Sequence, residues 1–137
     1  MTMPAGRYYV GDLCYVMTDL EWDEFCAITI KGHECLDGEF EFADGRRFAT
    51  YGTAWGDGVY SDQHGNQYPV DAGLIGCIRV EDIRTEKLGD VDAGTIHEFG
   101  TDFVTGGGRG TDHWSGVIQF GAVAIETDAQ EEALYDE

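Results

Sequence analysis

Two similar segments decide the fold: GEFEFADGRRF at residues 38–48 and GVYSDQHGNQY at residues 58–68. Each reads glycine, any residue, aromatic, four residues, glycine, two residues, aromatic. The pattern is typical of a β-hairpin, because strand residues alternate between two faces and a glycine accommodates the turn. We therefore expect two consecutive hairpins.

Side-chain parity predicts the length of the hairpin loops. A two-residue turn at Asp44 and Gly45 would put Phe40 and Phe48 on opposite faces of the sheet. A three-residue loop ending at Gly45 instead sets Phe40 directly across from Phe48, with the glycine in the left-handed conformation that such loops require. The first hairpin should therefore have a three-residue loop.

The second hairpin should also have a three-residue loop, which ends at Gly65 and sets Tyr60 across from Tyr68. Aromatic cross-strand pairs contribute about 0.2–1 kcal/mol each and help to fix the register. Because Pro69 lacks an N–H, its strand is expected to have a free edge.

The composition predicts one folded domain. Of the 137 residues, 42% are hydrophobic, and three Trp, seven Tyr and seven Phe can supply a core. Twenty glycines against two prolines suit a turn-rich β protein. There is neither an apolar run long enough to span a membrane nor a signal peptide, so we expect a cytoplasmic protein.

Charge is the strongest compositional signal. The chain has 27 Asp and Glu against eight Lys and Arg, a formal net charge of −19. Such a field repels nucleic acid and anionic membranes and favours basic partners. The alternative is that the acidity serves solubility or adaptation to a salty cytoplasm.

One helix is expected near the N-terminus, with Thr18 as its N-cap, Glu21 completing a capping box and Lys31-Gly32 ending it. Its apolar face should be formed by Leu20, Trp22, Phe25, Cys26 and Ile28.

Strands are expected at 7–10, 14–16, 74–80, 95–99, 102–105, 116–120 and 122–127, and a helical turn around 81–87. These elements predict a mainly β (α+β) domain over residues 1–127, an antiparallel β-sandwich or partly open barrel with one N-terminal helix. Residues 128–137 should form an acidic tail, either a short helix or disordered.

The cysteines at 14, 26, 35 and 77 show no CxxC or zinc-ribbon spacing, so reduced thiols are expected. Cys35 follows His33 by two residues, a spacing that two metal ligands can have, but no further ligand pair accompanies it. We predict no metal and no cofactor.

Aromatic and charged residues near glycines are candidates for ligand binding. Tryptophan rings in glycine-rich surroundings often line pockets, and the loop from Gly106 to Gly110 has the freedom to close over a ligand. The candidate set is Trp55, Asp57, Asp71, Arg109, His113 and Trp114. Asp12, Asp57 and Asp71 each stand beside a glycine or turn, where carboxylates more often accept backbone hydrogen bonds than bind metal.

Catalysis is not expected. His97 and His113, with Ser61 and Ser115 as the serines, have neither a nucleophile elbow nor diagnostic spacing. We predict a protein that is not an enzyme.

Three segments carry a resemblance: YYVGDLCYV at 8–16, YGTAWGDG at 51–58 and VDAGLIG at 70–76. With these motifs the chain resembles a family of short, uncharacterised proteins of tailed phages and their bacterial hosts, and FGAVAIET at 120–127 fits the same family. The resemblance implies a phage-like origin and work inside a bacterial cell, without assigning a catalytic residue.

These observations predict a binding protein that interferes with a host factor. One mechanism is acidic, nucleic-acid-like mimicry against a basic protein surface, with Asp19, Asp23 and Glu24 as partner-binding residues. A second is capture of a small ligand near Trp55, Trp114 and the glycine-rich loop. A third reading is a halotolerant or phage accessory protein without a ligand.

Overall fold

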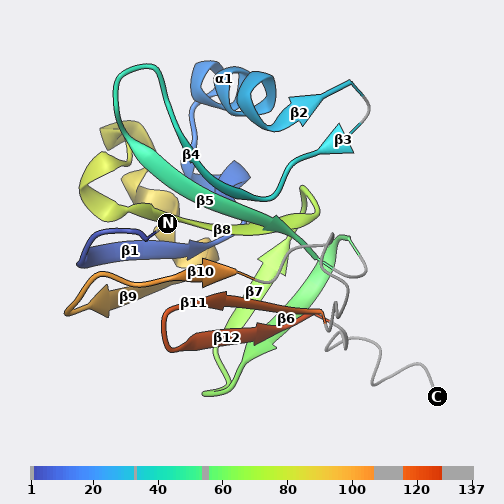
Figure 1. Cartoon of the computed structure of the whole chain (residues 1–137), viewed down its shortest axis with the longest axis vertical. Coiled ribbons are helices and arrows are strands. Elements are labelled where there is room, and N and C mark those ends of the chain that lie inside the picture. Colours follow the sequence, from blue (N-terminus) through green and yellow to red (C-terminus); the bar gives the residue numbers. More distant parts are fainter. Residues whose placement is uncertain (1, 33, 54–55, 107–115, 128–137) are drawn as a thin grey trace.

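The computed structural model describes residues 2–32, 34–53, 56–106 and 116–127. Two five-stranded antiparallel sheets pack face to face, and helix α1 (Asp19–Thr29) covers the outer side of one of them (Figure 1). The fold is therefore mainly β, as predicted. It is a sandwich and is not closed into a barrel. The predicted tail at 128–137 lies outside the described residues.

The first sheet has the order β4-β5-β8-β1-β9. Its strands are β4 (Gly38–Glu41), β5 (Arg47–Gly52), β8 (Leu74–Arg79), β1 (Gly6–Gly11) and β9 (Thr95–Phe99). The second sheet has the order β10-β11-β12-β6-β7. Its strands are β10 (Thr105–Gly106), β11 (Val117–Phe120), β12 (Val123–Glu126), β6 (Gly58–Asp62) and β7 (Gln67–Val70). A short pair, β2 (Ile30–Lys31) and β3 (Glu34–Cys35), follows α1.

Both hairpins have the predicted register, although each joins a different sheet. Phe40 pairs with Phe48 in the first, and Tyr60 pairs with Tyr68 in the second. Each loop is closed by a glycine with positive φ, 96° at Gly45 and 87° at Gly65. The free edge predicted from Pro69 is also confirmed, because β7 is the last strand of its sheet.

The core has two parts because the first sheet is buried on both faces. In β1, Tyr8 and Val10 point into the space between the sheets, whereas Tyr9 points toward the helical layer. The inner face of the second sheet completes the space between the sheets with Tyr60, Tyr68, Val70, Ile118, Phe120, Val123 and Ile125. The helical side packs Phe25 of α1 against Phe48 of β5, with ring centroids 5.1 Å apart.

Helix α1 begins as predicted, and four of the five residues expected on its apolar face pack on the sheet side: Trp22, Phe25, Cys26 and Ile28. Thr18 and Glu21 form the capping box. The inward positions are one turn apart, Glu21, Phe25 and Thr29, whereas Leu20 is 82% exposed. The prediction that Leu20 joins the apolar face is therefore wrong: polar partners from distant segments hold Glu21 inside. The helix also ends earlier than expected, since Ile30 and Lys31 form β2.

The predicted strand at 14–16 is also wrong. This segment is a 3-10 helix, η1 (Leu13–Val16), because Oδ1 of Asp12 accepts a hydrogen bond from the Cys14 N–H at 2.9 Å and turns the chain. The turn-rich region after β8 forms η2 (Val80–Asp82) and η3 (Thr85–Ala93). Of the strand predicted at 102–105, Phe103 makes an isolated bridge to Met3 and β10 starts only at Thr105.

All four cysteines are free, as predicted. Within the described residues, no helix combines the length and apolarity needed to cross a membrane.

Candidate interaction surface

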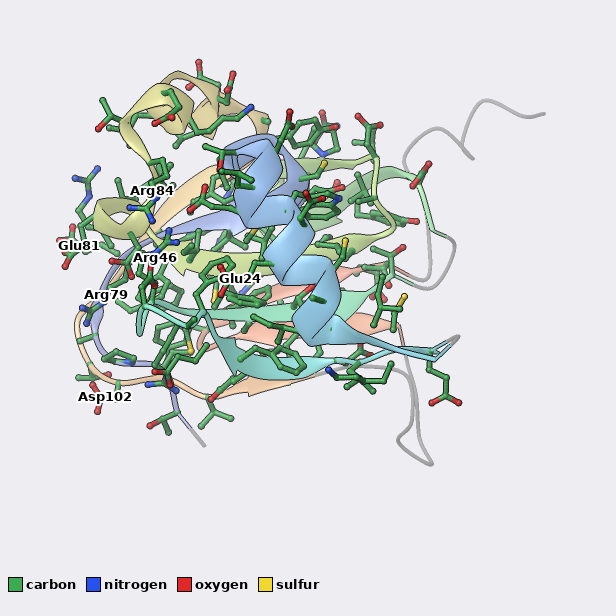
Figure 2. The ribbon with its side chains drawn as sticks, turned by 90° about the horizontal axis from the view of Figure 1, so that it is seen from above. Glu24, Arg46, Arg79, Glu81, Arg84 and Asp102 are labelled. Atoms are coloured by element: carbon green, nitrogen blue, oxygen red, sulfur yellow. The ribbon has the colours of Figure 1, made fainter. Side chains whose placement is uncertain are left out.

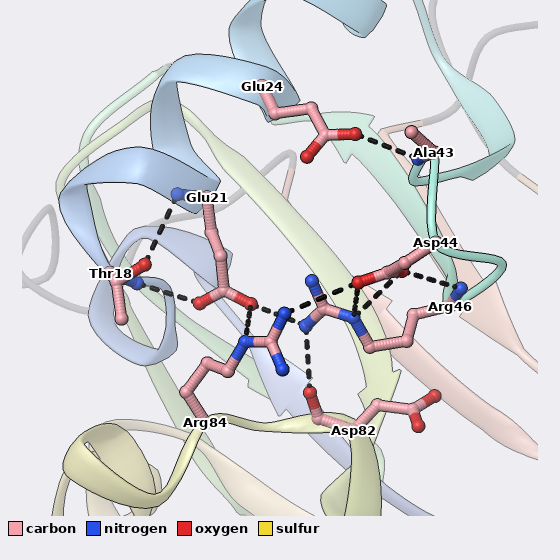
Figure 3. Close-up of polar contacts among 8 residues, drawn as sticks. All are labelled: Thr18, Glu21, Glu24, Ala43, Asp44, Arg46, Asp82 and Arg84. Carbon is pink, nitrogen blue, oxygen red and sulfur yellow. Dashed lines mark hydrogen bonds and ion pairs between the residues drawn. The ribbon is translucent and has the colours of Figure 1, made fainter.

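A network of ion pairs fixes the N-terminal end of α1 (Figure 3). Oε1 of Glu21 accepts a hydrogen bond from the Thr18 N–H at 2.9 Å, while Oε2 contacts the guanidinium groups of Arg46 and Arg84. Asp44 bridges the same two arginines, with Oδ2 2.9 Å from Nε of Arg46 and 3.3 Å from an Nη of Arg84. Three segments that are distant in sequence therefore meet at one buried carboxylate.

Arg46 is the centre of this network. It also donates a hydrogen bond to the carbonyl oxygen of Asp82 at 3.0 Å, and its guanidinium carbon lies 4.6 Å from the Phe42 ring centroid. Burial opposes the charge of Arg46, but hydrogen bonds to Glu21 and Asp44 outweigh it and raise the pKa of this guanidinium. The hydrogen bond that the backbone N–H of Arg46 donates to Asp44 is the main contact that lowers the pKa of this carboxyl group.

The three predicted partner-binding residues on α1 do not share one environment. Oε2 of Glu24 accepts a hydrogen bond from the Ala43 N–H at 2.8 Å, which ties the helix to the first hairpin loop (Figure 3). Asp19 and Asp23 are exposed, and neither forms an ion pair within the described residues. Together with the exposed Leu20 they form what we call the outer face of α1.

The basic side chains are mostly committed to contacts within the molecule. Of the seven described Lys and Arg, five form ion pairs: Arg46, Arg47, Arg79, Arg84 and Lys87. Figure 2 shows Arg46 and Arg84 near one another, and Arg79 near Glu81. Many exposed acids lack such a partner among the described residues, including Asp19, Asp23, Glu34, Asp57, Asp71, Glu86, Asp92 and Glu98. The solvent-facing field is therefore strongly negative.

The predicted ligand-binding set is only partly described. Trp55, Arg109, His113 and Trp114 lie outside the described residues, as does most of the glycine-rich loop beyond Gly106. The structure therefore leaves this set as a prediction.

The two remaining members of that set, Asp57 and Asp71, are both exposed. Oδ2 of Asp71 accepts a hydrogen bond from the Tyr15 hydroxyl at 2.7 Å. Burial, and then this hydrogen bond, raise the pKa of Tyr15. The carboxylate of Asp71 is thus already hydrogen-bonded to a side chain of the same molecule.

Asp12 has a structural role. It is fully buried, and its Oδ2 accepts hydrogen bonds from the N–H groups of Asp71 and Ala72 at 2.7 and 2.6 Å. Burial, followed by the charge of Asp12, raises the pKa of Cys14 to about 12. Among the described residues, no three His, Cys, Asp or Glu side chains are grouped so that they could hold a metal ion.

Sequence reasoning did not find Arg46 and Arg84 as partners of Glu21. The capping box was a local signal for the position of Glu21, but no spacing in the sequence links it to residues 25 and 63 positions away.

Comparison with protein-family models, curated proteins and solved structures finds no match to this chain. The resemblance to short phage and bacterial proteins therefore remains a prediction.

Proposed function

We propose that the protein is a non-enzymatic binding protein that occupies a basic, nucleic-acid-binding surface of a host-cell protein. The observation that carries this proposal is the unequal use of charge. Five of the seven described arginine and lysine side chains form ion pairs, while the carboxylates of Asp19 and Asp23 on the outer face of α1 stay exposed. A basic surface would gain Coulomb energy from these carboxylates without first breaking an ion pair.

The spacing on α1 is compatible with phosphate mimicry. Asp19 and Asp23 are four residues apart on a regular helix, so they are separated by about 6 Å along its axis. Successive phosphates of one DNA strand advance by about 3.4 Å along the duplex axis. The backbone positions of the two acids are therefore separated along the helix axis by a distance of the same order as the axial repeat of phosphates in one DNA strand.

Leu20 favours a protein partner over a purely salt-adapted surface. It is 82% exposed and lies between the carboxylates of Asp19 and Asp23 in the sequence. Adaptation to salt requires exposed charge but no exposed leucine. An apolar side chain surrounded by charge can instead enter a pocket of a partner and resist dissociation.

The test is capture followed by competition. The purified chain is immobilised and exposed to bacterial lysate at low salt, and bound proteins are then eluted with short duplex DNA. The proposal expects a basic, nucleic-acid-binding protein that DNA displaces and that does not bind a chain carrying Asp19→Asn and Asp23→Asn. Capture that is insensitive to DNA, or equal for the two chains, would contradict mimicry.

A further inference from the structure

A hollow of about 510 Å³ lies beneath α1, between the helix, the β2–β3 pair and the turn that joins β7 to β8. Its volume is within the range of about 300–1,000 Å³ that is usual for small-molecule sites. It is distinct from the outer face of α1, because the helix lines it with Trp22, Phe25, Cys26 and Thr29.

The wall of this hollow is mostly apolar. Trp22 is half-buried and stacks on Phe25, with ring centroids 4.6 Å apart and an interplanar angle of 10°. Leu36 and Leu74 contribute aliphatic surface. Burial raises the pKa of the Cys26 thiol, and the nearby Asp23 and Cys35 add to the shift, so this sulfur is neutral near pH 7.

The charged groups that the structure describes at this wall have one sign. Glu34 and Asp37 line the hollow, and none of its described lining residues is Lys, Arg or His. The carboxylate of Asp37 accepts a hydrogen bond from the Gly52 N–H at 3.0 Å, which fixes its place at the wall. These carboxylates would repel an anion, whereas a cation would meet them and an indole ring.

We propose that this hollow binds a small organic cation with an apolar body, such as an aromatic quaternary ammonium. The apolar body displaces water from Trp22, Leu36 and Leu74, and the charge lies near Glu34 and Asp37. This proposal does not depend on the partner-binding function, since it uses neither Asp19 nor Leu20.

The probes are benzyltrimethylammonium and benzylsulfonate, which have similar aromatic bodies and opposite charges. Each is titrated into the full-length chain and followed by two-dimensional NMR of the backbone amides and indole N–H groups. We expect saturable shifts that centre on Trp22 and Leu36 for the cation only. Equal binding of benzylsulfonate, or cation shifts spread without saturation over the acidic surface, would overturn the proposal.

A matched pair of variants locates the site. Leu36→Lys places a positive charge at the hollow, and Leu88→Lys places the same charge in η3; the two leucines are 37% and 41% exposed. A like charge within a few ångström should raise the Kd of benzyltrimethylammonium by about tenfold or more in Leu36→Lys. Leu88→Lys should change this Kd by less than about twofold, because solvent and salt screen the added charge. Equal effects of the two variants would mean that the cation binds elsewhere. Because both leucines are exposed, both variants should fold, and their amide spectra check this directly.

Discussion

The phenolic oxygen of Tyr68 lies 2.9 Å from Nε2 of His97, so that a fully buried tyrosine joins the two sheets. The same oxygen lies 2.7 Å from Oδ2 of Asp62. Because an ionised carboxylate can only accept, the Tyr68 hydroxyl donates to Asp62 and accepts from the Nε2–H of His97. This chain of hydrogen bonds gives His97 a structural role in the sandwich.

The first prediction is that His97 makes stability depend on pH. Burial lowers its pKa below the usual 6.5; the charge of Asp62 opposes this shift, and His64 adds to it. Between the lowered folded pKa and 6.5 the unfolded chain binds more protons, so stability should fall as the pH drops through this range. Urea melts from about pH 8 to about pH 5 measure this loss.

Two glutamine variants serve as controls. His97→Gln can still donate to Tyr68 but cannot titrate, so the part of the pH dependence that comes from His97 should vanish. His64→Gln replaces an exposed histidine and should leave most of the pH dependence of stability unchanged. A pH dependence that is unchanged in His97→Gln would show that other groups cause it.

The second prediction concerns the hairpin loops. Gly65 has a φ of 87°, and a β-branched residue there would be strained. Gly65→Val should therefore cost about 1–2 kcal/mol of unfolding free energy. Gly100→Val is the control, since Gly100 does not have positive φ and a Cβ would have nothing within 4 Å. If urea melts show an equal loss of unfolding free energy for the two variants, the loop does not require a left-handed conformation at Gly65.

The third prediction concerns close packing at the centre of the first sheet. A Cβ on Gly76 would lie 2.2 Å from the carbonyl oxygen of Ala49 and 2.8 Å from Cδ1 of Leu13. Gly76→Ala should therefore destabilise the protein by roughly 1–3 kcal/mol or more, as overpacking does. In Gly89→Ala the new Cβ meets nothing within 4 Å, so thermal melts should show little loss. Similar melting temperatures for both variants would contradict this packing.

The hairpins were predictable because their information is local. Side chains alternate between the two faces of a strand, so Phe40 and Phe48 can pair only if the loop between them has three residues and ends at the glycine. The capping box at Thr18 and Glu21 is equally local, since both partners lie within one turn.

The burial of Glu21 in place of Leu20 on α1 was not predictable, because long-range contacts decide it. Leu20 is more hydrophobic than Glu21, yet Glu21 is buried because Arg46 and Arg84 come to it from the first hairpin and from the segment before η3. The other oxygen of the carboxylate that starts η1 shows a similar long-range effect, because Oδ2 of Asp12 accepts hydrogen bonds from Asp71 and Ala72 in the turn before β8. The order of the first sheet likewise depends on pairings between strands far apart in sequence.

The fourth prediction is that Arg46 contributes more to stability than a surface cation. Its side chain is 13% exposed, and its removal would leave the carboxylate of Glu21 buried with less compensation. Arg46→Met should cost about 3–5 kcal/mol, the usual penalty for breaking a buried ion pair. Lys87→Met breaks the exposed pair with Asp90 and should cost less than about 1 kcal/mol. Denaturant melts of both variants measure the difference, and equal costs would show that the network around Glu21 contributes little.

The fifth prediction separates charge from apolar contact on the outer face of α1. The partner captured in the DNA-competition experiment should bind more weakly as salt rises from about 50 to about 300 mM, because ions screen exposed charges. Asp19→Asn with Asp23→Asn should weaken binding and flatten this salt dependence. Leu20→Ala should weaken binding while leaving the dependence on salt unchanged, since it removes no charge.

The control for the α1 variants neutralises two exposed acids elsewhere, Asp92→Asn with Glu98→Gln, and leaves the net charge equal to that of the double α1 variant. If binding depends on total charge alone, both double variants should weaken it equally. If the outer face of α1 is the contact, only the change at Asp19 and Asp23 should have a large effect. Glu24 is left out of these variants because its hydrogen bond to the Ala43 N–H would make a loss of binding and a loss of structure hard to separate. Affinity that does not change with salt would exclude electrostatic mimicry, because carboxylates at this exposure cannot act on a basic surface without being screened.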